Sequence, residues 1–186
     1  MPTSMRTSHT NIPARGWMAV NGLCGFCTAS RSRACVYLEG VNRARRPLWS
    51  CPQCSRQFAN RNQSHACGNY DFDSHFVGKH GQVRATFDRI VEVAGRNGPL
   101  TVLPEKTRIA LQVRMSFAAF TPRTQWLDGH VVLARRLENP RFRAIETYSP
   151  RNHVHVFRLF GPDEVDEEVA GWLSEAYRVG QQAHLG

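Results

Sequence analysis

The chain has 186 residues with a 41% hydrophobic and a 21% charged share, an ordinary composition for one globular domain with an appendage. No apolar run reaches the roughly 20 residues that a membrane-spanning helix needs, so no such helix is predicted. The net charge of +9 is unevenly distributed along the chain. Residues 1–50 hold seven Arg and one acidic residue, whereas residues 51–186 hold 17 Lys and Arg against 14 Asp and Glu. A basic chain favours polyanions as partners, and here this preference belongs mainly to the N-terminal segment.

The N-terminal segment, residues 1–48, is predicted to be a disordered basic arm. Ser, Thr, Arg, Asn and Gly dominate it, and it shows no hydrophobic periodicity. Its mildly apolar stretch Gly16–Cys27 is interrupted by Asn21 and Gly22, and no A-x-A cleavage site follows, so an export signal is not indicated. We therefore expect a cytoplasmic protein.

A compact cysteine unit, residues 49–68, follows the arm. Cys51 and Cys54 have the C-x-x-C spacing at which a tight turn directs two thiolates toward one ion. His65 and Cys67 complete a four-ligand set that suits tetrahedral zinc in a closed, structural site. We predict a C2HC zinc knuckle that holds one Zn²⁺ ion, with Phe58 as its small apolar core.

Other interpretations of the cysteines stay open. The H-x-C tail departs from the usual ligand spacing of zinc fingers, and His75 is a reserve ligand if His65 points away. Free thiols, or a redox pair of Cys51 and Cys54, are the alternatives to zinc. A second partial cluster lacks a matching spacing template, and its members are Cys24, Cys27, Cys35 and the distant His9.

Residues 69–180 are predicted to form an α+β domain. A short helix over Asp71–Val77 precedes a helix over Gln82–Ala94, whose apolar residues recur at helical spacing. Six strands follow without intervening helices, which indicates antiparallel pairing. They are expected at Leu100–Pro104, Thr107–Arg114, Phe117–Thr121, Gly129–Arg135, Ala144–Tyr148 and His153–Phe160.

Two further expectations concern the second strand and the end of the domain. In the second strand, Ile109 and Leu111 should face the core, whereas Arg108 and Gln112 should face the other way. A helix over Asp163–Val179 closes the domain, with acidic first turns that favour the helix dipole. The fold class is therefore α+β, a mainly antiparallel sheet packed by an N-terminal and a C-terminal helix and preceded by a small zinc finger.

Candidate contacts outside the cysteine unit carry less specific signals. Lys106 and Arg108 lie in a stretch rich in Arg and Phe, a composition that suits phosphate and base contacts, although a solvated sheet face is the simpler interpretation. His153 and His155 share one strand face, where a histidine can bind a metal or anchor a ligand. The chain contains no P-loop and no G-x-G-x-x-G, H-E-x-x-H or G-x-S-x-G motif, so whether it is an enzyme stays open.

A family resemblance covers Trp49 to Tyr177. It rests on WSCPQCSRQFANRNQSHAC, SHF, PEKTRIALQVRMSFA, HVHVF and PDEVDEEVAGWLSEAY. In these segments the chain resembles the domain-of-unknown-function family 5655, in its zinc-finger-headed bacterial form. The resemblance implies a cytosolic α+β module with no assigned activity. It also implies Cys51, Cys54, His65 and Cys67 as ligands, and it places Lys106, Phe117 and His155 on recurring positions without an established role.

Three functional hypotheses follow. The first is a non-enzymatic zinc-binding module that recognises a partner, with nucleic acid as the leading candidate because Arg56 and Arg61 of the finger can meet phosphates. The alternative is a small-ligand-binding or enzymatic domain with a pocket near His155 and Lys106. The third is an interaction role in which Trp126 or Trp172 contributes to a dimer face. The sequence does not predict an oligomeric state.

Overall fold

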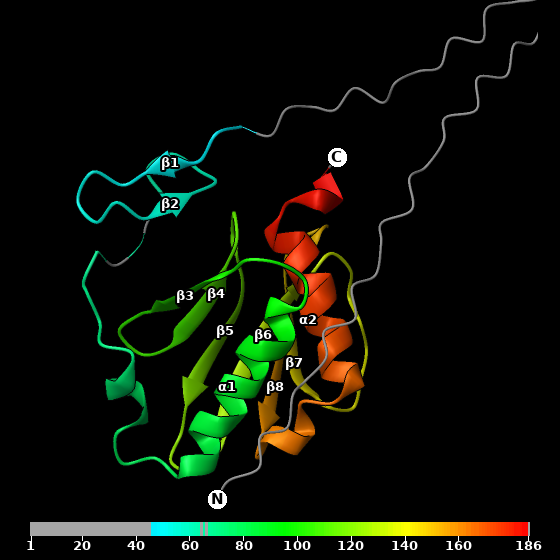
Figure 1. The fold of residues 1–186 in the computed structure, drawn as a ribbon. Coiled ribbons are helices and arrows are strands. Elements are labelled where there is room, and N and C mark those ends of the chain that lie inside the picture. Colours follow the sequence, from blue (N-terminus) through cyan, green and yellow to red (C-terminus); the bar gives the residue numbers. More distant parts are fainter. Residues whose placement is uncertain (1–45, 64, 66, 186) are drawn as a thin grey trace, which may run out of the picture. The chain divides into compact units, whose positions relative to one another are not determined.

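A computed structural model describes residues 46–63, 65 and 67–185 of the chain (Figure 1). Most of the predicted basic arm, including Cys24, Cys27 and Cys35, lies outside the described residues. Within the described part, no helix has the length and apolar character to cross a membrane.

The cysteine unit is built on a minimal hairpin. Strands β1 (Trp49–Ser50) and β2 (Gln57–Phe58) pair antiparallel, with Trp49 opposite Phe58. The backbone N–H of Cys51 donates to the Arg56 carbonyl, and that of Ser55 donates to the Cys51 carbonyl, both at 2.9 Å. Ser55 adopts a left-handed conformation with φ of 57°, which lets the chain reverse tightly between the two strands.

The domain that follows has the predicted order of one helix, six strands and one helix. After the 3₁₀ turn η1 (Asp73–Phe76) come α1 (Gly81–Gly95), β3 (Thr101–Pro104), β4 (Ile109–Gln112), β5 (Ser116–Pro122), β6 (Leu127–Leu133), β7 (Phe142–Ser149), β8 (Asn152–Leu159), η2 (Pro162–Glu164), α2 (Glu167–Gly180) and η3 (Ala183–Leu185). The α+β class and the antiparallel sheet are thus confirmed.

The six strands form one sheet in the order β3-β4-β5-β6-β8-β7, and every neighbouring pair is antiparallel. Helices α1 and α2 both pack against β5 and β6 and also touch each other. Since alternate strand residues face alternate sides, the residues Ile109, Leu111, Phe120 and Val131 lie on the helix-facing side, and all four are buried.

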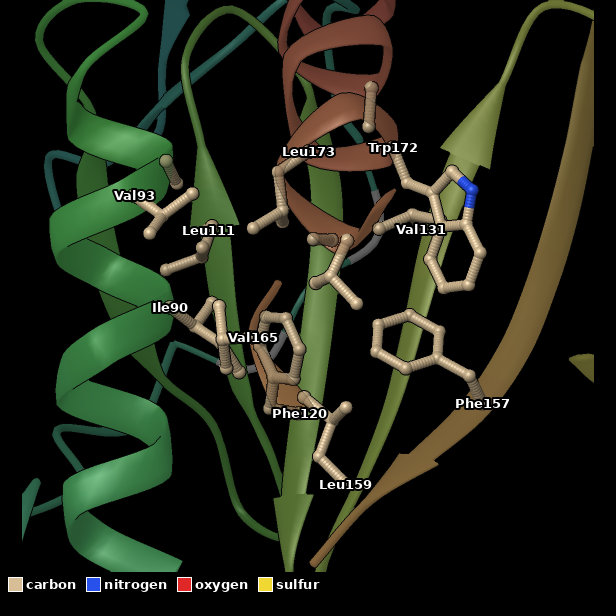
Figure 2. Close-up of a cluster of buried hydrophobic side chains, with 14 of the residues drawn as sticks. Ile90, Val93, Leu111, Phe120, Val131, Phe157, Leu159, Val165, Trp172 and Leu173 are labelled. Atoms are coloured by element: carbon tan, nitrogen blue, oxygen red, sulfur yellow. The ribbon is translucent and has the colours of Figure 1, made fainter. Parts of the chain in front are cut away.

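A single apolar core joins the sheet to the two helices (Figure 2). Ile90 and Val93 of α1 meet Leu111 of β4, while Leu173 of α2 lies over the centre of the sheet. Phe157 of β8 packs edge-to-face on Trp172 with ring centroids 5.5 Å apart. At roughly 1.5–3 kcal/mol for each fully buried large apolar side chain, these contacts are the main stabilising term of the domain.

The closing helix starts later than predicted. Pro162 opens the short turn η2, and Val165 then leaves helical geometry with φ of −83° and ψ of 66°. Asp166 caps α2, because its carboxylate accepts a hydrogen bond from the Val169 N–H at 3.0 Å. An Asp at this position stabilises a helix start there, so Asp163 and Glu164 precede the helix instead of lying in its first turn.

One other prediction is corrected in detail, and one residue of β4 has an unexpected contact. The expected helix over Asp71–Val77 is only the four-residue turn η1, since Asp71 accepts from the Ser74 N–H at 2.8 Å and Gly78 ends the segment at φ of 69°. Gln112, which is predicted to face away from Ile109 and Leu111, is also buried, since it is 5% exposed and its Nε2 donates to the Gln57 carbonyl at 2.6 Å. Strand β4 is accordingly buried along its whole length.

Candidate metal centre

The four predicted ligands converge. One donor atom each from Cys51, Cys54, His65 and Cys67 lies within 4.8 Å of all the others. Cys51 and Cys54 come from the turn between β1 and β2, whereas His65 and Cys67 return from the segment after β2. Residues 16 apart in the chain are thereby brought to one point, which is the arrangement that a chelating site requires.

Three of the distances between the donor atoms are close to the edges of a tetrahedron. The Sγ atoms of Cys51 and Cys67 are 3.8 Å apart, and His65 Nε2 lies 3.2 Å from the Sγ atoms of both Cys54 and Cys67. With Zn–S of about 2.3 Å and Zn–N of about 2.0–2.1 Å, an ideal tetrahedron has S···S edges of about 3.8 Å and S···N edges of about 3.6 Å. The residues therefore fit a four-coordinate metal, with the imidazole slightly closer to the thiols than in the ideal figure.

The orientation of the imidazole is fixed by the backbone. His65 Nδ1 lies 2.7 Å from the Gln63 carbonyl oxygen, so Nδ1 carries the proton and Nε2 is left with its lone pair toward the sulfur atoms. The ring also stacks on Phe58, with centroids 4.3 Å apart, and lies edge-on to Trp49. The small apolar core predicted around Phe58 is thus present, and it holds the histidine that closes the site.

The thiols differ in how readily they ionise. Burial opposes ionisation of Cys51, but hydrogen bonds from the backbone N–H groups of Cys54 and Gln53 outweigh it and lower its pKa to about 6. Desolvation and the neighbouring Cys51 raise the pKa of Cys67 to about 11. The Gln63 carbonyl, followed by the Cys54 thiol, raises the pKa of His65. Because a metal binds the thiolate form of cysteine, metal binding at neutral pH releases the proton of Cys67.

The other predicted site residues lie apart from the metal centre. Lys106 is exposed in the β3–β4 turn, and Arg108 pairs with Glu105 at 2.6 Å. His155 is fully buried in β8, which is separated from β4 by the two strands β5 and β6. Its Nε2 accepts from the Leu137 N–H at 2.9 Å and its Nδ1 lies 3.1 Å from the His153 carbonyl. Burial lowers the pKa of His155, so it is a neutral core residue with both nitrogens bonded.

The remaining residues that the sequence singled out, His75, His153 and Trp172, also lie outside the metal centre. His75, the reserve ligand, lies in η1 and is not part of the four-residue cluster. His153 contacts Thr147 Oγ1 at 3.0 Å and, like His155, is on the helix-facing side of β8. Trp172 is 5% exposed and stacks on Phe142 in the core.

Sequence reasoning missed two features of the described chain. One is the Gln63 carbonyl that orients His65, which no residue type signals because every residue has a backbone carbonyl. The other is an apolar cavity of about 340 Å³ beside α1 and β3. Its only charged lining residue, Asp88, lies off the buried face of a predicted helix, and that position alone does not indicate a cavity.

Comparison with known proteins identifies one region. A family model described as "Domain of unknown function (DUF5655)" matches residues 72–180, the span from just before η1 to the end of α2. The metal centre ends at Cys67 and so lies outside the matched region. No curated protein and no solved structure matches the chain.

Proposed function

The chain belongs to the DUF5655 family, and we propose that it is a non-enzymatic, zinc-binding module whose N-terminal part binds nucleic acid. The observation that carries the proposal is the closed four-ligand cluster, set in a stretch of chain that is basic and nearly free of acidic residues.

Zinc is the metal that the donor set favours. Three thiolates and one imidazole are soft and borderline ligands, which suit Zn²⁺ and not the oxygen-seeking Mg²⁺ or Ca²⁺. Four protein ligands leave no position open for a substrate, so the ion is structural. Thiolates stay available to a metal in a reducing compartment, and the proposal therefore places the protein in the cytoplasm.

The distribution of charge supports a polyanionic partner. Residues 1–70 contain nine Arg and one acidic residue, giving +8, whereas residues 71–186 contain 15 Lys and Arg against 14 acids, giving +1. A Zn²⁺ ion with three thiolates carries −1 and offsets little of this excess. Arg61 is exposed on the finger, and Arg56 beside it donates to the Gly68 carbonyl at 2.7 Å. Phosphate contacts from such a segment are the expected electrostatic footprint of nucleic-acid binding.

Metal analysis of the purified chain tests the first half of the proposal. We expect one zinc per chain in the wild type and a large loss in Cys67→Ser, with Ser55→Ala in the same turn as a matched control that keeps its metal. Wild-type protein without stoichiometric zinc would overturn the proposal.

Nucleic-acid binding is tested by fluorescence anisotropy with a labelled single-stranded oligonucleotide and its duplex. We expect affinity to fall steeply between 50 and 200 mM salt, and Arg61→Ala to weaken binding. Arg136→Ala, which removes an exposed body arginine paired with Glu138, should leave binding unchanged. Absence of binding at low salt to either probe would contradict the second half while leaving the metal site standing.

A further inference from the structure

Apart from the metal centre, the structure has a cavity that a small ligand can occupy. A cavity of about 340 Å³ lies between α1 and the edge strand β3. It is lined by Phe87, Asp88 and Val91 from α1, by Val102 and Pro104 from β3, and by Phe72 from the segment before η1. Its volume is within the range of about 300–1,000 Å³ that is usual for small-molecule sites.

The walls and the rim differ in chemistry. Five of the six lining residues are apolar, and Phe87 at the base is 1% exposed. Phe72 packs on Phe87 with ring centroids 5.6 Å apart, so two aromatic rings present their surfaces on one side of the cavity. Asp88 is the single charged lining residue, and its side chain is 57% exposed at the rim.

The charged group that contains Asp88 has an excess of negative charge. The Arg84 guanidinium bonds both Asp88 oxygens through Nε at 3.0 and 3.1 Å, and it bonds Asp73 through Nη1 at 2.7 Å. It also lies over the Phe72 ring, 4.7 Å from the centroid, which fixes its position. Two carboxylates thus share one cation, leaving a net charge of −1, and the Asp88 carboxylate retains acceptor capacity beyond the two bonds from Arg84.

We propose that this cavity binds a small amphipathic amine, with an aromatic or branched apolar body against Phe72, Phe87 and Val91 and its ammonium group at Asp88. The apolar walls favour the body by burying its surface, and the negative rim favours a cation over a neutral or anionic head group. An added peptide strand is disfavoured as the occupant, because β3 has only four residues and Pro104 removes one donor from its edge.

The test uses three ligands of matched shape: 2-phenylethylamine, 2-phenylethanol and phenylacetate. Each is titrated into the zinc-loaded full-length chain and followed by amide NMR shifts of α1 and β3. We expect saturable binding of the amine with a Kd on the order of 1 mM. The alcohol should bind about two- to five-fold more weakly, as loss of an exposed ion pair implies, and phenylacetate should bind more weakly still.

Variants separate the apolar walls from the charged rim. Val91→Trp should fill the cavity and abolish binding of all three ligands. Asp88→Asn should bring the amine and the alcohol to equal affinity, while Glu92→Gln, one turn further along α1 and outside the cavity, should leave their ratio as in the wild type. If Val91→Trp does not fold, the comparison of Asp88→Asn with Glu92→Gln decides alone.

Three outcomes would overturn the proposal. Equal wild-type affinity for the amine and the alcohol would remove the role of the rim charge. The absence of saturable shifts in α1 and β3 would show that no such ligand enters. Self-association in sedimentation that Val91→Trp abolishes would show that a second copy of the chain covers the cavity instead.

Discussion

At the scale of single residues, two histidines of the sheet are kept neutral by burial. His155 is satisfied on both nitrogens by backbone groups. His130 faces the opposite side of the sheet, between Ala119 and Val156 of the neighbouring strands. Burial, reinforced by the nearby Arg108, lowers the pKa of His130 to about 4, against a smaller opposing effect of Glu105 and Glu146. Neither residue needs a ligand to explain its environment.

Replacement of His155 tests its structural role. His155→Leu removes the acceptor of the Leu137 N–H and should destabilise the domain by about 1–3 kcal/mol, the usual cost of a buried group left without its partner. Chemical denaturation measures the loss. Zinc content and ligand affinities should be unchanged, and a variant as stable as the wild type would contradict the assignment.

Acid should destabilise the protein through His130. The unfolded chain binds a proton near the ordinary histidine pKa of 6.5, whereas the folded chain binds it only near 4. The contribution is therefore fully present above pH 6.5 and is lost as the pH falls through 4, by about 2 kcal/mol when partial exposure is taken into account.

Unfolding free energies of the wild type and of His130→Gln, both zinc-loaded, should converge as the pH falls from 7 to 4. The metal ligands contribute equally to both proteins, so their effect cancels in the difference. Parallel curves over this interval would show that His130 titrates normally in the folded state.

At the scale of elements, the most informative boundary is the start of α2. The sequence places acids at 163, 164, 166, 167 and 168, and only one of them is the cap. The apolar stripe predicts the helix, but residue type alone does not rank these acids, because each is a good N-terminal residue. The choice is made by Pro162, which starts η2, and by the bond from Asp166 to Val169.

Asp166→Ala should accordingly cost more than Asp163→Ala. Loss of the cap removes about 1 kcal/mol, and the ion pair of Asp166 with Arg141 at 2.7 Å is lost with it. Asp163 precedes the helix, and its removal should stay within about 0.5 kcal/mol. Thermal or urea unfolding of the pair provides the comparison, and equal losses would argue against the observed boundary.

At the scale of the whole molecule, the described chain contains a hairpin that carries the four candidate metal ligands and a domain with its own core. In the hairpin, Trp49, Phe58 and the ring of His65 pack on one another, and this apolar cluster is too small to fold a segment of this size without a metal. The domain buries one continuous cluster from both helices and the sheet.

Chelation should therefore unfold one part and spare the other. After EDTA treatment, we expect amide NMR signals of the cysteine unit to collapse to unfolded positions while those of α1, α2 and the sheet remain dispersed. Returning Zn²⁺ should restore the original spectrum, whereas Mg²⁺ should not. Simultaneous loss of both sets of signals would mean that the domain depends on the metal as well.

Much of this architecture is predictable from the sequence, for identifiable reasons. Alternating apolar residues such as Ile109 and Leu111 predict one face of a strand directly. The spacing C-x-x-C followed by H-x-C indicates a set of metal ligands without any knowledge of the fold. The burial of Gln112 is not predictable in this way, because it depends on a contact with Gln57, 55 residues away. The cavity beside Asp88 was missed for the same reason, since its walls come from three separate segments.

The strand order carries a consequence for how the domain folds. Four of the five neighbouring pairs in the sheet join strands that are consecutive in the chain, and the exception, β6 with β8, skips only one strand. Such local connectivity lowers the entropy lost on forming each pair and favours rapid folding for a sheet of this size. The contact between α1 and α2 joins segments that are far apart in the sequence, because α1 is the first α-helix of the domain and α2 is its last. We therefore expect docking of the two helices to carry the largest cost in chain entropy, and substitutions at their mutual contact to slow folding more than substitutions within the hairpins.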